Sequence, residues 1–175
     1  MPVEINQAIP EAQPKAHALR RPVESTILSF WTSLGRARAD RADLRRCRNP
    51  GEAAFTPAFH RLFGQICSAD IRPDLERLAV VAVALANVEQ NESSATFSVQ
   101  LATGVDGRPC LSALRFRRIL AIDGMPELQT QLARAIRLLD RQANVVNLAL
   151  SILSWDDETK KRWAFQYYGK IQIKK

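Results

Sequence analysis

The sequence predicts an all-α fold made of two small helical bundles, of about four helices each, joined by a loop. Two observations carry this prediction. Apolar residues recur at spacings of three and four along most of the 175 residues, as they do on the buried face of an amphipathic helix. In addition, no convincing stretch alternates between apolar and polar residues as a half-buried strand would, since residues 171–173 are too few to count.

The N-terminal half is expected to hold a tail and then the first bundle. Residues 1–22 contain four prolines and little periodicity, which predicts a flexible tail. The first bundle is expected over residues 23–90, and its helices follow apolar stripes at 24–37, 38–48, 57–67 and 73–88. Because the last of these segments is apolar on nearly every side, we expect it to be the central buried helix of this bundle.

The C-terminal half begins with a joining loop over residues 91–108, where polar residues and glycines break the pattern. The second bundle is expected over residues 109–170. Its helices are predicted at 111–122, at 126–142, at 145–153 and from about 157 through 168. Ser154 to Asp157 resemble a capping box that opens the last helix, and Gly169 is expected to end it.

Composition narrows the class of protein. Lys and Arg number 25 against 18 Asp and Glu, so the net charge is +7, which favours a polyanionic partner. The longest apolar run, residues 78–86, is far shorter than the roughly 20 residues of a membrane-spanning helix, and the first residues lack the apolar core of a secretory signal. Three scattered cysteines argue against a disulfide framework or a zinc site, and we expect a cytoplasmic protein with no membrane partner.

Basic residues gather in clusters that are rich in arginine, whose planar fork suits phosphate. On a helix, Arg38, Arg41, Arg45 and Arg48 would share an arc of roughly 80°, where they repel one another unless something negative lies opposite. A phosphate backbone is the natural counterpart, because each contact also releases counterions. The candidate nucleic-acid-binding residues are Arg38, Arg41, Arg45, Arg46, Arg48, Arg115, Arg117, Arg118, Arg134, Arg137, Arg141, Lys160, Lys161 and Arg162.

Each cluster also has a purely structural interpretation. A basic stripe can be a solvated face, and Arg134, Arg137 and Arg141 lie opposite an apolar face as on any amphipathic helix. The arginines of segment 111–122 interrupt an otherwise apolar helix, and burying an unpaired charge is expensive. They must therefore reach a groove, a ligand or the molecule's own carboxylates, for which the candidates are Glu127, Asp156, Asp157 and Glu158.

Signals for catalysis are weak. The sequence has no phosphate-binding loop, no nucleophile elbow and no dinucleotide-binding motif, and its two histidines, His17 and His60, stand alone. Adjacent acids at residues 156–158 could in principle hold a metal, but helix capping and the helix dipole explain acids at a helix start. We therefore predict a protein that is not an enzyme and that uses no metal and no cofactor.

Three segments together resemble a known family. They are residues 42–50 (ADLRRCRNP) with 57–63 (PAFHRLF), residues 111–120 (LSALRFRRIL), and the basic and aromatic end at 160–168. Over roughly residues 24–169 the chain resembles the CasB small subunit of the type I-E CRISPR surveillance complex, Cascade. The segment 111–120 is the most specific part of the resemblance.

The resemblance implies a non-catalytic subunit of an antiviral complex, present in two copies beside other Cascade proteins and a guide crRNA. It implies contact with the guide-paired target DNA strand and stabilisation of the displaced single strand of the R-loop. The family's basic residues correspond to Arg45, Arg46, Arg115, Arg117, Arg118 and residues 160–162.

Three other functions are compatible with the residues alone. In a stand-alone helical DNA-binding regulator, segment 38–48 would be the recognition helix. A metal-dependent nuclease would use the acids at 156–158. A structural helical adaptor would bind no nucleic acid.

Overall fold

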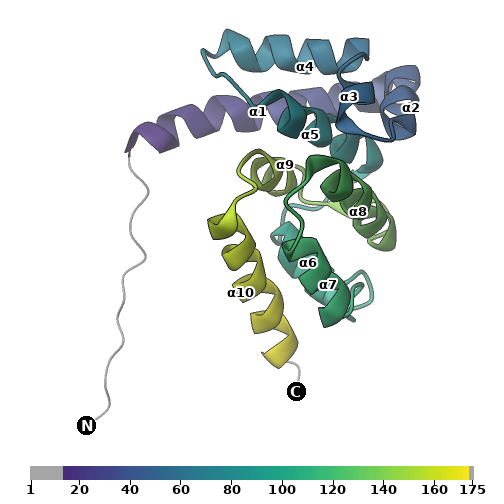
Figure 1. Cartoon of the computed structure of the whole chain (residues 1–175), viewed down its shortest axis with the longest axis vertical. Coiled ribbons are helices and arrows are strands. Elements are labelled where there is room, and N and C mark those ends of the chain that lie inside the picture. The colour runs from purple at the N-terminus through teal and green to yellow at the C-terminus, as the bar shows by residue number, and fades with distance from the viewer. Residues whose placement is uncertain (1–13, 174–175) are drawn as a thin grey trace.

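The computed structural model describes residues 14–173 and confirms the all-α prediction. Figure 1 shows α1–α5 together at one end of the molecule, α6, α7 and α10 at the other, and α8 and α9 between them. Over the described residues there are ten helices and one pair of two-residue strands: α1 (Pro14–Arg36), α2 (Arg38–Arg46), α3 (Pro50–Ala53), α4 (Pro57–Ser68), α5 (Leu75–Asn87), β1 (Gln90–Asn91), α6 (Phe97–Thr103), α7 (Ala113–Leu120), α8 (Met125–Leu138), β2 (Gln142–Ala143), α9 (Val145–Leu153) and α10 (Asp157–Ile173).

Helix α1 begins earlier than the sequence pattern predicts. It starts at Pro14, inside the expected tail, while residues 1–13 lie outside the described part. The residues between Pro14 and Pro22 include alanine, leucine, lysine and arginine, which all favour helix. A proline inside a helix removes one backbone hydrogen bond and crowds the preceding turn, and α1 continues through Pro22 despite this cost.

Helix α5 is the centre of the molecule. Asp74 caps it by accepting a 2.9 Å hydrogen bond from the backbone N–H of Arg77, and every residue from Leu78 to Asn87 is buried. It packs against α2 and α3 on one side and against α8 and α9 on the other. The helix that we expected at the centre of the first bundle therefore also serves the C-terminal half, and one hydrophobic cluster runs through both halves.

The expected joining loop is wrong in part, because it contains helix α6. Polar residues hid this helix in the sequence. Ser98 and Gln100 are buried, and each has a partner: Ser98 donates to the side-chain oxygen of Gln166 on α10, and Gln100 donates to the carbonyl of Glu92. Once these hydrogen bonds are made, a polar side chain can lie in the interior.

Strands β1 and β2 form a parallel pair that joins the two halves, with Gln90 opposite Gln142 and Asn91 opposite Ala143. Asn144 follows β2 and caps α9 by accepting a hydrogen bond from the N–H of Asn147. The pair is too short to show any alternation in the sequence.

Helix α10 also differs from the prediction at both ends. The cap is Asp156, which accepts a 2.8 Å hydrogen bond from the N–H of Thr159, and the helix continues past Gly169 to Ile173. A glycine ends a helix when it turns left-handed; inside a helix it costs only about 1 kcal/mol relative to alanine. Buried Trp163 and Tyr167 hold α10 against the rest of the second half. Within residues 14–173, no helix combines the length and the apolar character needed to cross a membrane.

Candidate nucleic-acid interface

The arginines of α2 do not form one solvent-facing stripe. The helix ends at Arg46, so Arg48 lies beyond it. Arg38 and Arg46 are exposed, and Arg46 pairs with Asp43 one turn earlier. Arg41 and Arg45 are only partly exposed, because they turn toward the point where the two halves meet.

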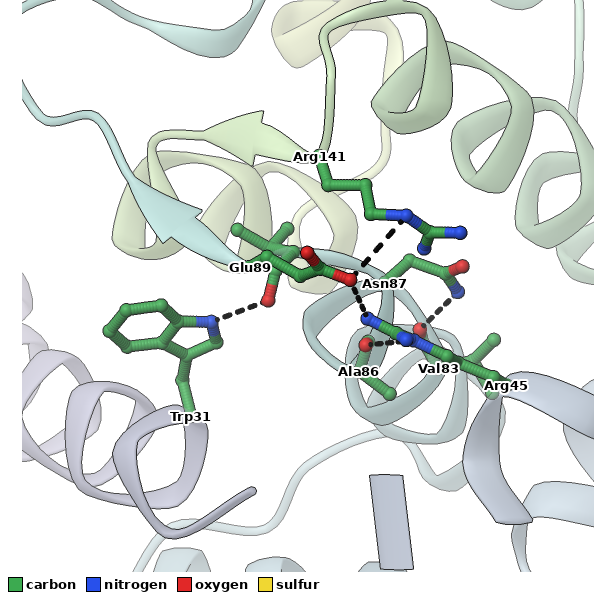
Figure 2. A network of polar contacts seen from close by, with 8 residues as sticks. Trp31, Arg45, Val83, Ala86, Asn87, Glu89 and Arg141 are labelled. Atoms are coloured by element: carbon green, nitrogen blue, oxygen red, sulfur yellow. Dashed lines mark hydrogen bonds and ion pairs between the residues drawn. The ribbon is translucent and has the colours of Figure 1, made fainter. Parts of the chain in front are cut away.

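Arg45 is held by two hydrogen bonds to residues that are far away in the sequence. Its Nε donates to the carbonyl of Ala86 at 2.7 Å, and its Nη2 donates to Oε1 of Glu89 at 2.9 Å. The same carboxylate oxygen lies 3.5 Å from Nε of Arg141. Figure 2 shows Glu89 between these two guanidinium groups. We call Arg41, Arg45, Glu89 and Arg141 the junction cluster.

Arg141 does not belong to the stripe on α8 that the sequence predicts. The helix ends at Leu138, and the chain then passes through Asp140 and Arg141 with φ values of 50° and 60°. This turn lets the carbonyl of Arg141 accept hydrogen bonds from the N–H groups of Glu89 and Gln90, at 2.8 and 3.2 Å. It also places the Arg141 side chain beside Glu89. Arg134 and Arg137 stay on α8 and are exposed.

The junction cluster carries three positive charges against one negative charge. Burial lowers the pKa of the Arg41 guanidinium, and the charge of Arg45 lowers it further, whereas Glu89 acts in the opposite direction. The Nε of Arg41 and Nη1 of Arg141 are buried and have no hydrogen-bond partner among the described residues. The cluster is therefore short of acceptors.

A second basic feature is a groove between α7 and α8, with a volume of about 680 Å³. Ser112 caps α7, and Phe116 and Ile119 turn into the core, so that the arginines of this helix face outward. Side chains of both helices line the groove, and we call it the α7–α8 groove. Its charged and polar lining residues are Arg115, Arg118, Glu127, Gln131 and Arg134.

The arginines of α7 form no ion pair with another described residue. No carboxylate of the described residues lies within 4.0 Å of the charged groups of Arg115, Arg117 or Arg118, and all three side chains are exposed. The sequence left open whether these arginines pair with the chain's own acids. The structure shows no such pair among the described residues. Two of the three, Arg115 and Arg118, reach the groove.

The basic residues at the start of α10 separate into different roles. Lys160 is largely buried, forms a 2.5 Å ion pair with Asp123 and lies 5.8 Å from the centre of the Trp155 ring. Arg162 donates to the hydroxyl of Thr159 at 3.2 Å, and both Arg162 and Lys161 are exposed. Only part of this cluster is thus open to a ligand.

Of the acids near the start of α10, Asp156 caps the helix, whereas Asp157 and Glu158 lie in its first turn. The hydrogen bond from the N–H of Thr159 lowers the pKa of Asp156. In the part of the chain that the structure describes, no group of three or more His, Cys, Asp or Glu side chains is placed to hold a metal ion.

Sequence reasoning missed one residue that matters here, Glu89, which lies just after α5 in a polar stretch. Glu89 acts through its contacts with Arg45 and Arg141. Because Arg45 lies 44 residues before Glu89 in the sequence, only the fold brings these side chains together.

Comparison with known families gives one match. The model of the family described as CRISPR-associated protein Cse2 matches residues 40–168, which is most of the chain and includes every candidate basic residue except Arg38. No curated protein and no solved structure matches significantly.

Proposed function

Because the chain belongs to the Cse2 family, whose members are subunits of the type I-E CRISPR complex Cascade, we propose that it holds nucleic acid in that complex by its sugar–phosphate backbone. In this proposal the chain is a non-catalytic, cytoplasmic subunit. Its partners are the other Cascade proteins, a guide crRNA, the target DNA strand, the displaced strand and a second copy of itself.

The α7–α8 groove is the observation that carries the proposal. Three arginines from two helices face one hollow that contains a single acid, Glu127. Free guanidinium groups of this kind form paired hydrogen bonds to phosphate oxygens. They read no base sequence, since phosphate contacts position a strand without specifying it.

Such a surface suits a complex in which base pairing supplies specificity. Pairing of the guide with the target strand selects the sequence, so the protein has only to support the strands. Exchange of a DNA duplex for an RNA–DNA duplex has a free energy close to zero, so a few phosphate contacts can shift the equilibrium toward the RNA–DNA duplex. A positive track for a single strand meets this need.

The salt dependence of binding tests the proposal on the isolated chain. Binding to a fluorescent oligothymidine and to an oligonucleotide of mixed sequence should be similar, and the logarithm of the affinity should fall linearly with the logarithm of salt, by about 0.7 per phosphate contact. Protection of one palindromic operator in a footprint would instead support a stand-alone regulator.

Binding in the assembled complex gives a second test. Replacing Arg117 and Arg118 by alanine should reduce retention of target DNA, because both side chains are exposed and neither forms an ion pair within residues 14–173. The matched control is Arg21→Ala with Arg72→Ala, which removes the same charge from two exposed arginines outside the candidate set. Equal retention by the two folded variants would contradict the proposal.

A further inference from the structure

The carboxylate of Glu89 pairs with two arginines, Arg45 and Arg141, at the point where the two halves of the chain meet. One of its oxygens, Oε1, accepts from Arg45 and lies 3.5 Å from Nε of Arg141. Arg41 lies close enough for Arg45 and Glu89 both to act on its charge. The junction cluster therefore retains two uncompensated positive charges.

The guanidinium groups of the cluster are also short of hydrogen-bond acceptors. A guanidinium carries five N–H donors, yet Nε of Arg41 and Nη1 of Arg141 are buried and have no partner. The cluster is not sealed, since the side chains of Arg45 and Arg141 keep 28% and 34% of their exposure. An anion that arrives from solvent can thus contact the exposed parts of these two guanidinium groups.

The backbone at Arg141 is a second, independent sign of a ligand. A φ of 60° favours glycine or asparagine, and it costs a residue such as arginine roughly 1 kcal/mol. Its neighbour Asp140 also has a positive φ. Strain of this kind concentrates at sites of ligand contact. The turn carries an arginine where glycine would be less strained, and its side chain points at the junction cluster (Figure 2).

We propose that the junction cluster binds one phosphate group of a nucleic-acid strand, and that Glu89 competes with this phosphate for Arg45 and Arg141. The inference rests on the proposed function and adds a second contact point to it. Glu89 is 47% exposed, so its carboxylate can swing into water when the phosphate arrives. The competition weakens the contact and makes it reversible. Because Arg45 comes from α2 and Arg141 precedes β2, the bound phosphate would bridge the two halves of the chain.

The variant Glu89→Gln tests the competition directly. Glutamine keeps an oxygen that can accept from Arg45 but removes the negative charge, so the affinity of the full chain for a fluorescent oligothymidine should rise about three- to tenfold. The matched control is Glu92→Gln, which makes the same change three residues further on, where the carboxylate accepts from the N–H of Ser94 instead. That control should tighten binding less than twofold, since among the described residues Glu92 forms no ion pair with an arginine of the cluster and exposed charges interact weakly.

A second pair of variants keeps the test open if Glu89→Gln fails to fold. Arg141→Gly relieves the backbone strain while it removes a phosphate ligand, so the protein should fold, bind several-fold more weakly and lose about 0.7 from its salt slope. Asp140→Gly relieves the same kind of strain and keeps Arg141, so its salt slope should be unchanged.

The outcomes separate this inference from the proposed function. Tighter binding by Glu89→Gln supports the competition, and a lower salt slope for Arg141→Gly alone supports the phosphate contact at the junction cluster. If the wild type binds but Glu89→Gln behaves like Glu92→Gln, and Arg141→Gly like Asp140→Gly, the inference is overturned while the proposed function stands. If the wild type and all variants fail to bind at low salt, the proposed function falls, and the inference with it.

Discussion

The hydroxyl of Tyr167 on α10 donates a 2.6 Å hydrogen bond to the carbonyl of Leu111, just before α7 begins. The ring of the same tyrosine stacks on Phe116 of α7, with ring centres 3.8 Å apart. Helix α10 thus fixes both the start and the inner face of the helix that carries Arg115, Arg117 and Arg118. The position of the α7–α8 groove depends on this contact.

Replacing Tyr167 by phenylalanine should lower the free energy of unfolding by about 1–2 kcal/mol, because it leaves a buried carbonyl without its partner. Tyr168→Phe is the control, since among the described residues the Tyr168 hydroxyl has no hydrogen bond; its effect should be under about 0.5 kcal/mol. Urea denaturation of both variants measures the difference. Equal stabilities would show that the Tyr167 hydroxyl contributes nothing.

Stability should fall at alkaline pH. Burial raises the pKa of Tyr167 to about 12, and the neighbouring Tyr168 and Cys110 add to the effect. In the unfolded chain the same phenol ionises near pH 10. The neutral form therefore stabilises the fold fully below about pH 10, and this contribution is lost as the pH rises from 10 through 12. Urea titrations across this range should show a smaller loss for Tyr167→Phe than for the wild type. Burial also raises the pKa of the Cys110 thiol to about 11, so the comparison is best made in a Cys110→Ala background.

The turn after α6 should tolerate only glycine. Gly104 has a φ of 57°, and a Cβ at this position would lie 2.1 Å from the backbone oxygen of Arg108. We expect Gly104→Ala to destabilise the protein by at least about 2 kcal/mol, through strain and displacement of the following turn. Gly64→Ala is the matched control, because this helical glycine has open space around it and alanine should stabilise α4 by about 0.5–1 kcal/mol. If thermal or urea unfolding finds Gly104→Ala at least as stable as Gly64→Ala, the strain assigned to this turn is contradicted.

We expect even a conservative substitution of Arg45 to destabilise the protein. Lysine cannot make both of the hydrogen bonds that Arg45 makes to Ala86 and Glu89, so Arg45→Lys should destabilise the fold by about 1–3 kcal/mol. Arg46→Lys is the control, since Arg46 is exposed and pairs with Asp43 on the same helix. Such surface pairs contribute at most about 1 kcal/mol. If the two variants unfold at the same urea concentration, Arg45 is not an anchor between the halves.

Helices whose apolar residues face one core could be predicted from the sequence. The predicted segment 145–153 coincides with α9, and 57–67 differs from α4 by one residue at its end. In both, side-chain caps at Asn144 and Thr56 mark the start and apolar residues recur at helical spacing. Helix α6 could not be found this way, because Ser98 and Gln100 are buried only by virtue of partners on α10 and just after β1. Helix α3 was also missed, because it begins with a proline and a glycine, residues that usually mark a break between helices.

The basic clusters were equally visible in the sequence, but their roles were not. An arginine is free or engaged according to partners that the chain supplies from elsewhere. Arg45 meets Glu89, and Lys160 meets Asp123 across 37 residues, so neither pair has a local signal. The arginines of α7 stay free because the core takes Phe116 and Ile119 and leaves their neighbours outside.

This difference between free and engaged cations gives a prediction for the α7–α8 groove. Replacing Arg115, Arg118 or Arg134 singly by alanine should weaken binding to oligothymidine and to mixed-sequence oligonucleotides by the same factor. Each change should lower the salt slope by about 0.7, because one phosphate contact is lost without any loss of base reading. The free energy of unfolding should change by less than about 0.5 kcal/mol, since Arg115 and Arg118 make no ion pair within the described residues.

Lys160→Ala is the contrasting variant: it breaks the pair with Asp123 and the contact over Trp155, so it should lose stability and keep the salt slope of the wild type. Titrations at several salt concentrations, with unfolding measured in parallel, separate the two kinds of residue. A slope that falls for Lys160→Ala and not for the groove variants would place the contact on α10 instead.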